Sequence, residues 1–410
     1  MSSVLSSLLK GLEQLQEETI WVAFSGGVDS TVLLHALTQC HPKHKIKAIH
    51  VNHHLNAKSD DWAKHCLNFS KGLGVELSIF NVQVPSRSNI EALAREQRYK
   101  VFDLQLPQEA TLLMAHHLND QVETFFLKAF SGQGVAGLAG IPASRKMGNK
   151  TLLRPFLNLS KSDIEEYAHA HHLQWIEDDS NSVVDFDRNW IRHELMPLIE
   201  SRFPGISPAI AKSQEKCLSA QRCLNELAKI DGLPKIDRVP LSTLAVLSEQ
   251  RQKNLLIQWC FDLTGRHPSW EQLAEFLRQC LGPDNDAQLI VNQYTFRRWR
   301  HYIYAFPSIL PKPPEPLKWS PSEPISLFGE DILLDGQSLG LKDEVYDVWY
   351  WRQGIPAEIS PSKHHLKNRF QSLGIPPWLR CYIPLITKKK KLVVPIDKIM
   401  SYSPSWIKDS

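Results

Sequence analysis

The sequence predicts an α/β protein whose first half is a parallel β-sheet with helices on both faces. From about residue 19 to 190, short apolar runs alternate with segments of helical periodicity. The runs are TIWVAF, IKAIHV, ELSIFNV and TLLMAHH, and a helical pattern follows each of them. Such alternation indicates parallel strands joined by right-handed helical crossovers. In sheets of this class, nucleotides bind at the carboxyl ends of the strands.

Beyond Pro204 the pattern changes, so a first domain is expected over residues 1–205. Residues 206–310 predict a mainly helical domain that ends in LIVNQYTFRRWRHYIYAF, whose alternation is typical of a hairpin. The proline-rich residues 311–330 predict an extended, semi-rigid connector rather than a folded element. A small α+β domain is expected over 331–410. A chain of 410 residues is long enough for two or three such units.

Composition is that of a soluble globular protein, with 42% hydrophobic and 22% charged residues. No run approaches the ~20 apolar residues of a membrane-spanning helix, and the N-terminus lacks the features of an export signal. A cytoplasmic protein without a membrane partner is expected. The seven cysteines include no C-x-x-C pair, which favours reduced, buried thiols over a zinc or iron–sulfur site. A net charge of +3 does not identify a nucleic-acid partner, so an RNA site must be a local basic patch.

The most informative segment is SGGVDS, residues 25–30, which joins an apolar strand directly to a helical pattern. Gly26 and Gly27 allow the backbone to approach phosphate oxygens, and Ser25 and Ser30 can donate hydroxyl groups. Asp29 suits a Mg²⁺ ion, which prefers carboxylate and phosphate oxygens. A helix N-cap after a glycine turn is the alternative, but it explains only the serine and the glycines.

Two other glycine patterns are excluded. The segment is not a Walker A loop, because it lacks G-x-x-x-x-G-K-[ST] and its lysine. Residues 132–137, GQGVAG, match G-x-G-x-x-G formally, yet a helical pattern precedes them and a loop-like segment follows. The Rossmann fingerprint requires a strand before and a helix after, so a flexible loop near the site is expected instead.

Histidines close the second predicted strand at HVNHH, residues 50–54. They are expected near a bound nucleotide at the carboxyl edge of the sheet. Hydrogen bonding to the nucleotide, or loop structure alone, is favoured over metal binding, because no zinc-type spacing is present.

Basic residues follow on a predicted helix. Arg95, Arg98 and Tyr99 share one face at spacings of three and four. Paired arginines there could clamp phosphates, and a solvated charged face is the alternative.

The segment AHHLNDQVET, residues 115–124, follows another apolar strand and opens a helix. Asp120 and Glu123 are three residues apart and so lie on one face. Adjacent carboxylates suit recognition of an ammonium group, and they could also promote deprotonation of an amine nucleophile. The alternative is helix capping by Asn119 or Asp120.

In order, SGGVDS, HVNHHLN, EALAREQRY, AHHLNDQVET, SGQGVAGLAGI, LLRPFL and DDSN…RNWIR…LMP resemble the successive motifs of the tRNA(Ile)-lysidine synthases. The resemblance spans roughly residues 19–200. LKNRFQSLGIPPWLRCYIPLI resembles the terminal domain of longer members, and about 215–310 matches only in position and helical character. SGGVDS also resembles the loop of ATP pyrophosphatases, which cleave between the α and β phosphates. The implied fold of the first domain is Rossmann-like, of the adenine nucleotide alpha hydrolase type.

The resemblance implies a ligase that forms a carbon–nitrogen bond. ATP adenylates the carbonyl oxygen at carbon 2 of the wobble cytidine, position 34 of the CAU anticodon of tRNA(Ile). L-lysine then displaces AMP and yields lysidine, which switches decoding from AUG to AUA. Because tRNA(Met) shares this anticodon, other parts of the tRNA must be read. The candidate basic patches are Arg297, Arg298, Trp299, Arg300 and Lys388 to Lys391, with solvated charge as the default for the lysine run.

The resemblance also implies roles for single residues. Ser25, Gly26, Gly27, Val28, Asp29 and Ser30 are expected to bind ATP, with Asp29 linked to Mg²⁺. The lysine substrate is expected at Asp120, Glu123 and Arg192, and the phosphates or the cytidine at His116, Arg95 and Arg98. The expected catalytic residues are Asp29, His116, Asp120 and Arg95, and Arg98 is counted among the residues that bind substrate.

The chain departs from the family pattern at a few positions. Many members carry Asp where Asn119 stands, and Gly and Arg where His54 and Asn56 stand. Other adenylating enzymes of the superfamily are the nearest alternative, although cytidine thiolases typically show the paired cysteines that this chain lacks. A catalytically inert RNA-binding protein is a second alternative, against which the intact Ser25, Asp29 and Ser30 argue.

Overall fold

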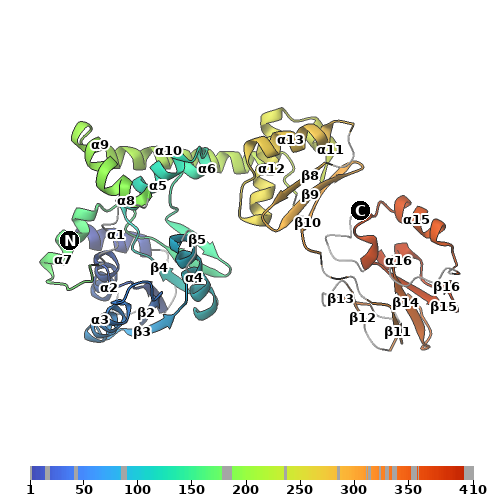
Figure 1. The fold of residues 1–410 in the computed structure, drawn as a ribbon, viewed down its shortest axis with the longest axis horizontal. Helices are drawn as coiled ribbons and strands as arrows, with labels where there is room; N and C mark the ends of the chain where they lie inside the picture. Colours follow the sequence, from blue (N-terminus) through green and yellow to red (C-terminus); the bar gives the residue numbers. More distant parts are fainter. Residues whose placement is uncertain are drawn as a thin grey trace. The chain divides into compact units, whose positions relative to one another are not determined.

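The computed structural model describes residues 2–13, 19–40, 45–84, 90–177, 187–234, 238–283, 287–310, 312, 315–322, 325–327, 332–334, 339–351, 358 and 360–400. Contacts divide the chain into two compact units, Met1–Arg222 and Cys223–Ser410 (Figure 1). Across the described ranges, no helix has both the length and the apolar character needed to cross a membrane.

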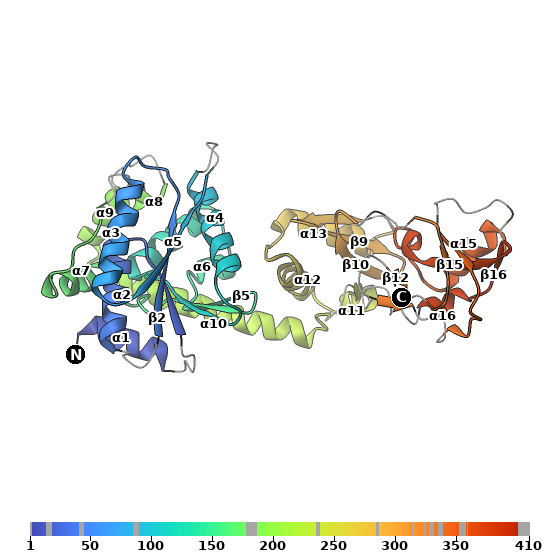
Figure 2. The same ribbon diagram turned by 90° about the horizontal axis from the view of Figure 1, so that it is seen from below.

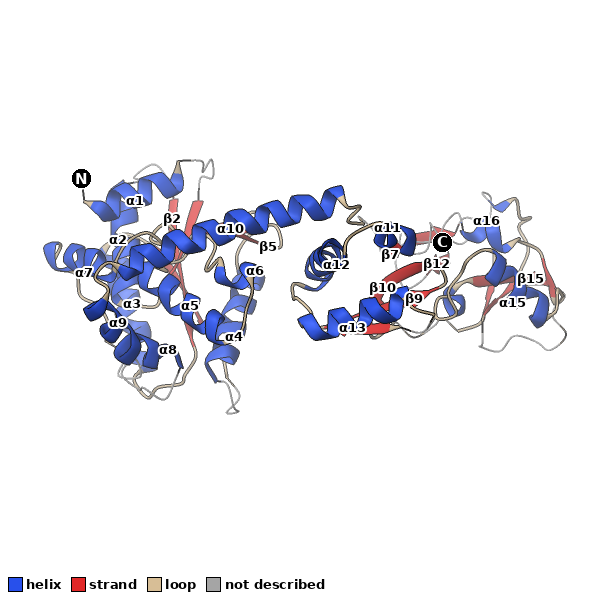
Figure 3. Ribbon diagram, turned by 90° about the horizontal axis from the view of Figure 1, so that it is seen from above, coloured by secondary structure: helices blue, strands red, loops and turns tan. Residues whose placement is uncertain are grey.

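A six-stranded sheet organises the first unit, in the order β3-β2-β1-β4-β6-β5. Figure 3 shows its strands in red among the blue helices of this unit. All neighbouring strands are parallel except the edge pair β5 and β6. The predicted parallel sheet is confirmed, and its four apolar runs are the strands β1 to β4. The strands are β1 (Thr19–Ala23), β2 (Lys45–Asn52), β3 (Glu76–Asn81), β4 (Thr111–Leu113), β5 (Ser144–Met147) and β6 (Lys150–Leu153).

Helices connect these strands and continue beyond them. A π-helix, Ile191–Leu195, interrupts the segment between α8 and α9. The α-helices are α1 (Ser3–Leu12), α2 (Val28–Cys40), α3 (Ser59–Gly72), α4 (Ile90–Gln105), α5 (Leu118–Phe130), α6 (Val135–Leu138), α7 (Lys161–Ala170), α8 (Asp187–Trp190), α9 (Met196–Arg202) and α10 (Ile206–Ile230).

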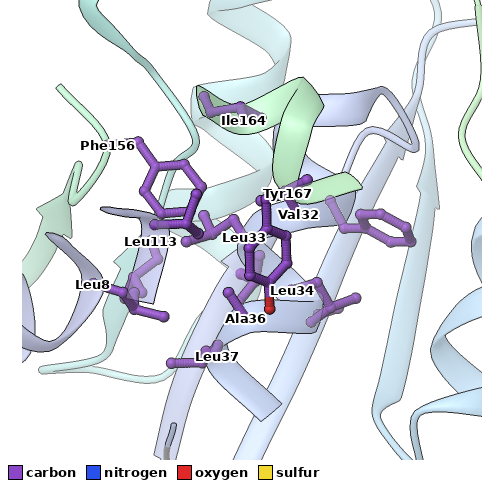
Figure 4. Packing of buried hydrophobic residues seen from close by; sticks show 14 of the residues in the cluster. Leu8, Val32, Leu33, Leu34, Ala36, Leu37, Leu113, Phe156, Ile164 and Tyr167 are labelled. Atoms are coloured by element: carbon purple, nitrogen blue, oxygen red, sulfur yellow. The ribbon is translucent and has the colours of Figure 1, made fainter. Parts of the chain in front are cut away.

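Each face of the sheet buries its own core, because successive strand residues point to opposite sides. Ile20 and Val22 of β1 belong to a core that also includes residues of α1, α2 and α7. Figure 4 shows Leu33, Phe156 and Tyr167 of this core close together. Trp21, between them in sequence, packs on the other face with residues of α4. Figure 2 shows α2 and α3 on one side of the sheet and α4 on the other.

This arrangement creates a reversal of strand order beside β1. The chain moves outward from β1 to β2 and β3, and then returns by way of α4 to place β4 on the other side of β1. Ligands of open α/β sheets bind at the carboxyl ends of the strands that flank such a reversal. The segments that leave β1 and β4 are therefore the expected site.

The described residues of the second unit form two antiparallel sheets and a short hairpin. One sheet has the order β7-β10-β9-β8 and the other β11-β14-β15-β16. The predicted hairpin is confirmed as β9 and β10, and two more strands complete its sheet. The elements are β7 (Arg238–Pro240), α11 (Leu241–Ala245), α12 (Glu249–Thr264), α13 (Trp270–Leu281), β8 (Gln288–Val291), β9 (Tyr294–Trp299), β10 (Tyr302–Pro307), β11 (Leu317–Trp319), β12 (Ile325–Leu327), β13 (Ile332–Leu334), β14 (Tyr346–Tyr350), α15 (Lys363–Ser372), the 3-10 helix η3 (Arg380–Tyr382), β15 (Pro384–Lys388), β16 (Lys391–Leu392) and α16 (Ile396–Met400).

Some expectations need correction. Within the proline-rich residues 311–330, Leu317–Trp319 form β11, and Trp319 is buried in the C-terminal core, so this part is not a connector. Residues 132–137 are indeed not a Rossmann fingerprint, since a helix precedes them, but Val135–Leu138 form a helical turn rather than a flexible loop. All seven cysteines are free. Cys66, Cys260 and Cys280 are buried as predicted, whereas Cys223 is exposed and Cys40, Cys217 and Cys381 are only partly buried.

Gly26 provides a stability test of the loop. Its φ is +89°, and an added Cβ would lie 2.4 Å from Ile176 Cδ1 and 2.8 Å from Cys66 Sγ. Gly74 also has a positive φ, of +69°, but nothing lies within 4 Å of its Cβ position. Gly26→Ala should therefore destabilise the protein more than Gly74→Ala does, by about 1–3 kcal/mol. Calorimetry should show a melting temperature several degrees lower, and equal values for both variants would refute the close packing.

Candidate active site

The glycine-rich loop lies at the carboxyl end of β1. The Ser25 backbone N–H donates to Ser30 Oγ at 3.2 Å, and the two serine hydroxyl oxygens lie 3.0 Å apart. Ser30 Oγ donates in turn to the Gly27 carbonyl at 3.1 Å. Helix α2 begins at Val28, so the positive end of its dipole faces the loop. The predicted order of strand, glycine turn and helix is confirmed. The contacts between Ser25 and Ser30 join the two ends of the loop.

Asp29, in the first turn of α2, forms an ion pair with Lys161. Asp29 Oδ1 lies 2.7 Å from Lys161 Nζ, and the two side chains are 31% and 32% exposed. Lys161 is the first residue of α7, and its backbone N–H donates to Asn119 Oδ1 at 3.1 Å. Asn119 thus ties the start of α7 to the start of α5. The amide oxygen of Asn119 is thus the acceptor that helps to hold Lys161 beside the loop.

His117 lies between two carboxylates. It is the N-cap of α5, where its Nδ1 accepts the Asn119 backbone N–H at 3.2 Å. In the neutral ring the proton is therefore on Nε2. That nitrogen lies 3.7 Å from both Asp29 Oδ2 and Asp120 Oδ2. The capping residue is His117, not Asn119 or Asp120, although Asp120 completes the capping box by accepting the His117 backbone N–H at 2.9 Å.

Asp120 and Glu123 share an arginine, as their helical spacing allows. Arg188 Nη2 lies 2.9 Å from Asp120 Oδ1, and Arg188 Nε lies 2.6 Å from Glu123 Oε2. Arg192 Nε lies 2.6 Å from Glu123 Oε1, and its Nη2 lies 3.0 Å from Oε2. Glu123 is only 2% exposed, so its carboxylate is buried between two guanidinium groups. Burial acts to raise the pKa of Asp120, but His117 and Arg188 lower it below its usual value.

The two arginines come from one irregular helical segment. Arg188 lies in α8 and Arg192 in the π-helix that follows, four residues apart in sequence. π-Helical turns are rare and frequently occur at functional sites. Residues 179–181, which belong to the same family motif, lie outside the described residues.

His116 is a half-buried, neutral imidazole beside this network. Burial lowers its pKa to about 3, Asp120 opposes the shift, and Arg154 and Arg95 add to it. Its Nδ1 is buried and has no hydrogen-bond partner within the described ranges. At neutral pH the ring can therefore offer a substrate an uncharged hydrogen-bonding group.

Histidines in β2 and directly after it lie on the strand next to β1. His50 Nδ1 lies 2.8 Å from the Phe24 carbonyl, which connects β2 to the start of the loop. Burial, with Arg98 and His50, lowers the pKa of His53 to about 4. His54 has a φ of +51°, a left-handed conformation that glycine adopts more readily than other residues do.

Helix α4 brings Arg95 and Tyr99 together as predicted from their spacing. Arg95 Nη2 donates to Tyr99 Oη at 3.3 Å, and its Cζ lies 5.1 Å from the ring centroid. Arg98, on the same helix, acts on His53 as described above. The face predicted from the sequence thus borders the carboxyl edge of the sheet through both arginines.

The donors around the loop suit a magnesium ion that arrives with a nucleotide. Asp29 presents a partly exposed carboxylate at the helix N-terminus. In the described part of the chain, no group of three His, Cys, Asp or Glu side chains could hold a metal by itself. Mg²⁺ commonly binds through one or two carboxylates together with substrate phosphates, so the residues present fit that mode.

Several side chains of the predicted basic patches in the second unit already have partners within the protein. Arg298 Nη1 donates to the carbonyls of Gly282 and Gln279, which gives it a structural role at the end of α13. Lys388 and Lys390 form ion pairs with carboxylates. Arg297 and Arg300 lie over the rings of Trp378 and Trp299, with Cζ 5.1 and 4.7 Å from the centroids.

Three family models match successive parts of the chain. They are described as PP-loop domain, over residues 1–199, TilS substrate binding domain, over 240–304, and TilS substrate C-terminal domain, over 348–397. Among solved structures, the U34-tRNA thiolase NcsA from Methanococcus maripaludis is 17% identical with a TM-score of 0.46. It covers 53% of this chain and 78% of its own.

Curated relatives match over nearly the whole length. The tRNA(Ile)-lysidine synthase of Coxiella burnetii (strain RSA 493 / Nine Mile phase I) is 33% identical over 91% of this chain and 87% of its own. That of Serratia proteamaculans (strain 568) is 36% identical over 93% of this chain and 91% of its own. The chain therefore belongs to the tRNA(Ile)-lysidine synthase family.

Proposed function

We propose that this enzyme uses ATP to join L-lysine to carbon 2 of cytidine 34 in the CAU anticodon of tRNA(Ile). The products are lysidine, AMP and pyrophosphate, and the modified tRNA decodes AUA instead of AUG. One observation carries the proposal: the phosphate loop after β1 and the buried carboxylate–arginine network after β4 are joined through His117, which lies 3.7 Å from Asp29 and from Asp120. Since tRNA and ATP are both cytoplasmic, we propose that compartment.

The loop of residues 25–30 would hold the triphosphate. Its hydroxyl groups and the start of α2 donate to phosphate oxygens, and Lys161 supplies a positive charge. Lys161 is paired with Asp29 in this structure, and phosphates would give it a new partner. Asp29 would then be released to bind Mg²⁺, which neutralises phosphate charge as pyrophosphate leaves.

The lysine substrate would bind at Asp120, Glu123 and the two arginines. A free amino acid carries one carboxylate and one ammonium group on its α carbon. It can enter a network of alternating charges by exchanging partners, so that every buried charge stays paired. The arginines would take the α-carboxylate and Asp120 the α-ammonium. The side-chain amine would then remain available for attack.

The proposed reaction has two steps, adenylation of the cytidine and displacement of AMP by lysine. The cytidine oxygen attacks the α phosphorus, and pyrophosphate leaves with the electrons of the broken phosphoanhydride bond. The neutral lysine amine then attacks carbon 2, AMP departs with the former carbonyl oxygen and the electrons of the broken carbon–oxygen bond, and the proton lost by the amine passes to solvent. Ionised Asp120 holds the lysine in place through its α-ammonium group, and neutral His116 offers a hydrogen bond to the cytidine. Arg95, like Arg98, supplies positive charge near the phosphates.

The function is tested by transfer of labelled lysine. With ATP, Mg²⁺ and a tRNA(Ile) transcript bearing CAU, we expect one labelled lysine per tRNA and an equal amount of AMP. A tRNA(Met) transcript should accept none, and Asp29→Ala should abolish transfer. ATP cleavage that ignores lysine would instead favour another adenylating reaction, and no cleavage at all would favour an RNA-binding protein.

Arg192→Gln should raise the KM for lysine and leave the KM for ATP nearly unchanged. A lost hydrogen bond to a charged group costs about 1.5–3 kcal/mol, or roughly 10- to 100-fold in affinity. Arg202→Gln is a matched control, because Arg202 is exposed on α9. Steady-state kinetics with each substrate varied separately measures both constants. Similar changes in the two variants, or a rise confined to the KM for ATP, would argue against the lysine site.

A further inference from the structure

Three guanidinium groups gather around Tyr99 at one side of the proposed active site. Arg95 comes from α4, Arg145 from the edge strand β5, and Arg154 follows β6 directly. The Cζ atoms of Arg95 and Arg145 lie 5.1 and 5.0 Å from the centroid of the Tyr99 ring. Arg154 interacts with the tyrosine hydroxyl. We call these four residues the tyrosine–arginine cluster.

The innermost member is a buried cation. Arg154 is 4% exposed, and its Nη1 donates to the Pro142 carbonyl at 2.7 Å. Its Nε is buried and, among the residues that the structure describes, has no hydrogen-bond partner. Burial lowers the pKa of Arg154; Tyr99 opposes the shift, and the positive charges of Arg145 and Arg95 add to it.

Such a cluster favours an anion. A buried charge without an opposite partner is costly, and like charges held together repel one another. Guanidinium groups match phosphate geometry with paired N–H donors, and stacking on an aromatic ring holds them in place. The buried, unpartnered Nε of Arg154 leaves one donor unsatisfied. A phosphate held by the exposed Arg95 and Arg145 would compensate the positive charge of the cluster.

The position of the cluster distinguishes it from the nucleotide loop. In the sheet order β1-β4-β6-β5, β4 separates β1 from β6. Arg154 directly follows β6. Neighbouring strands are about 4.8 Å apart, so the ends of β1 and β6 are separated by roughly 10 Å. His116 lies between the two regions, because it follows β4, which separates β1 from β6 in the sheet. The cluster therefore borders the reaction centre on the side away from the loop.

We propose that Arg95, Arg145 and Arg154, arranged around Tyr99, bind a phosphodiester of the RNA strand next to the modified cytidine. The proposal rests on the proposed function, because it requires an RNA substrate whose base reaches His116. A phosphate of ATP has the same chemistry and is the other possible occupant. The distance of the cluster from the loop favours the RNA.

The test compares two neighbouring residues of β5. Arg145 is exposed, so Arg145→Gln should fold, and Lys146→Gln removes the same charge from the next residue, whose side chain points to the other face of the sheet. Binding of the tRNA(Ile) transcript is measured at several salt concentrations without turnover. Each lost phosphate contact reduces the slope of log K against log salt by about 0.7–0.9. We expect this reduction for Arg145→Gln only, with the KM for ATP unchanged.

Other outcomes would overturn the assignment. Equal slopes in wild type and Arg145→Gln, or equal losses in both variants, would show that Arg145 makes no specific RNA contact. A raised KM for ATP with an unchanged slope would identify the nucleotide as the occupant. Arg154→Lys, checked for folding by its melting temperature, should weaken tRNA binding as well. If wild type binds tRNA with the expected slope yet transfers no lysine, the proposed function fails while the RNA contact stands.

Discussion

Parallel pairing of β1 with both β2 and β4 is the constraint on which the site depends. It places the segments that leave β1 and β4 side by side at one edge of the sheet. The loop at Ser25 and the capped start of α5 at His117 are thereby brought together, although some ninety residues separate them in sequence. Each face of β1 is buried in a separate core, which holds this pairing in register.

Alternating charge is the second organising feature. Across the site each charged or polar group has an opposite neighbour, in the order Lys161, Asp29, His117, Asp120, Arg188, Glu123 and Arg192. Removing such groups from water is costly unless they are paired, and Glu123 is almost fully buried. A paired network of this kind can exchange its partners for the charges of a substrate. The tyrosine–arginine cluster is the exception, because two of the groups that act on Arg154, Arg145 and Arg95, carry the same positive charge, and Tyr99 alone opposes them.

Local patterns predicted much of the fold and part of the site. The parallel sheet, the loop at residues 25–30, and the shared face of Asp120 and Glu123 all follow from periodicity and from the turn residues. Lys161 could not be found this way, since its contact with Asp29 joins residues 132 apart and arises only when α7 packs against α2. His117 caps α5 and His116 does not, and the sequence of two adjacent histidines does not show which of them is the cap. The burial of Trp319 does not follow from local patterns, because the prolines around it predict an extended connector rather than a short buried strand.

A crystal structure with a non-hydrolysable ATP analogue and Mg²⁺ is the most direct test of nucleotide binding at β1. We expect the triphosphate against Ser25 to Ser30, with a phosphate oxygen beside Lys161 Nζ and the 2.7 Å contact to Asp29 opened. The Asp29 carboxylate should then face the metal ion. A nucleotide bound away from this loop, with the Asp29–Lys161 ion pair intact, would contradict the assignment.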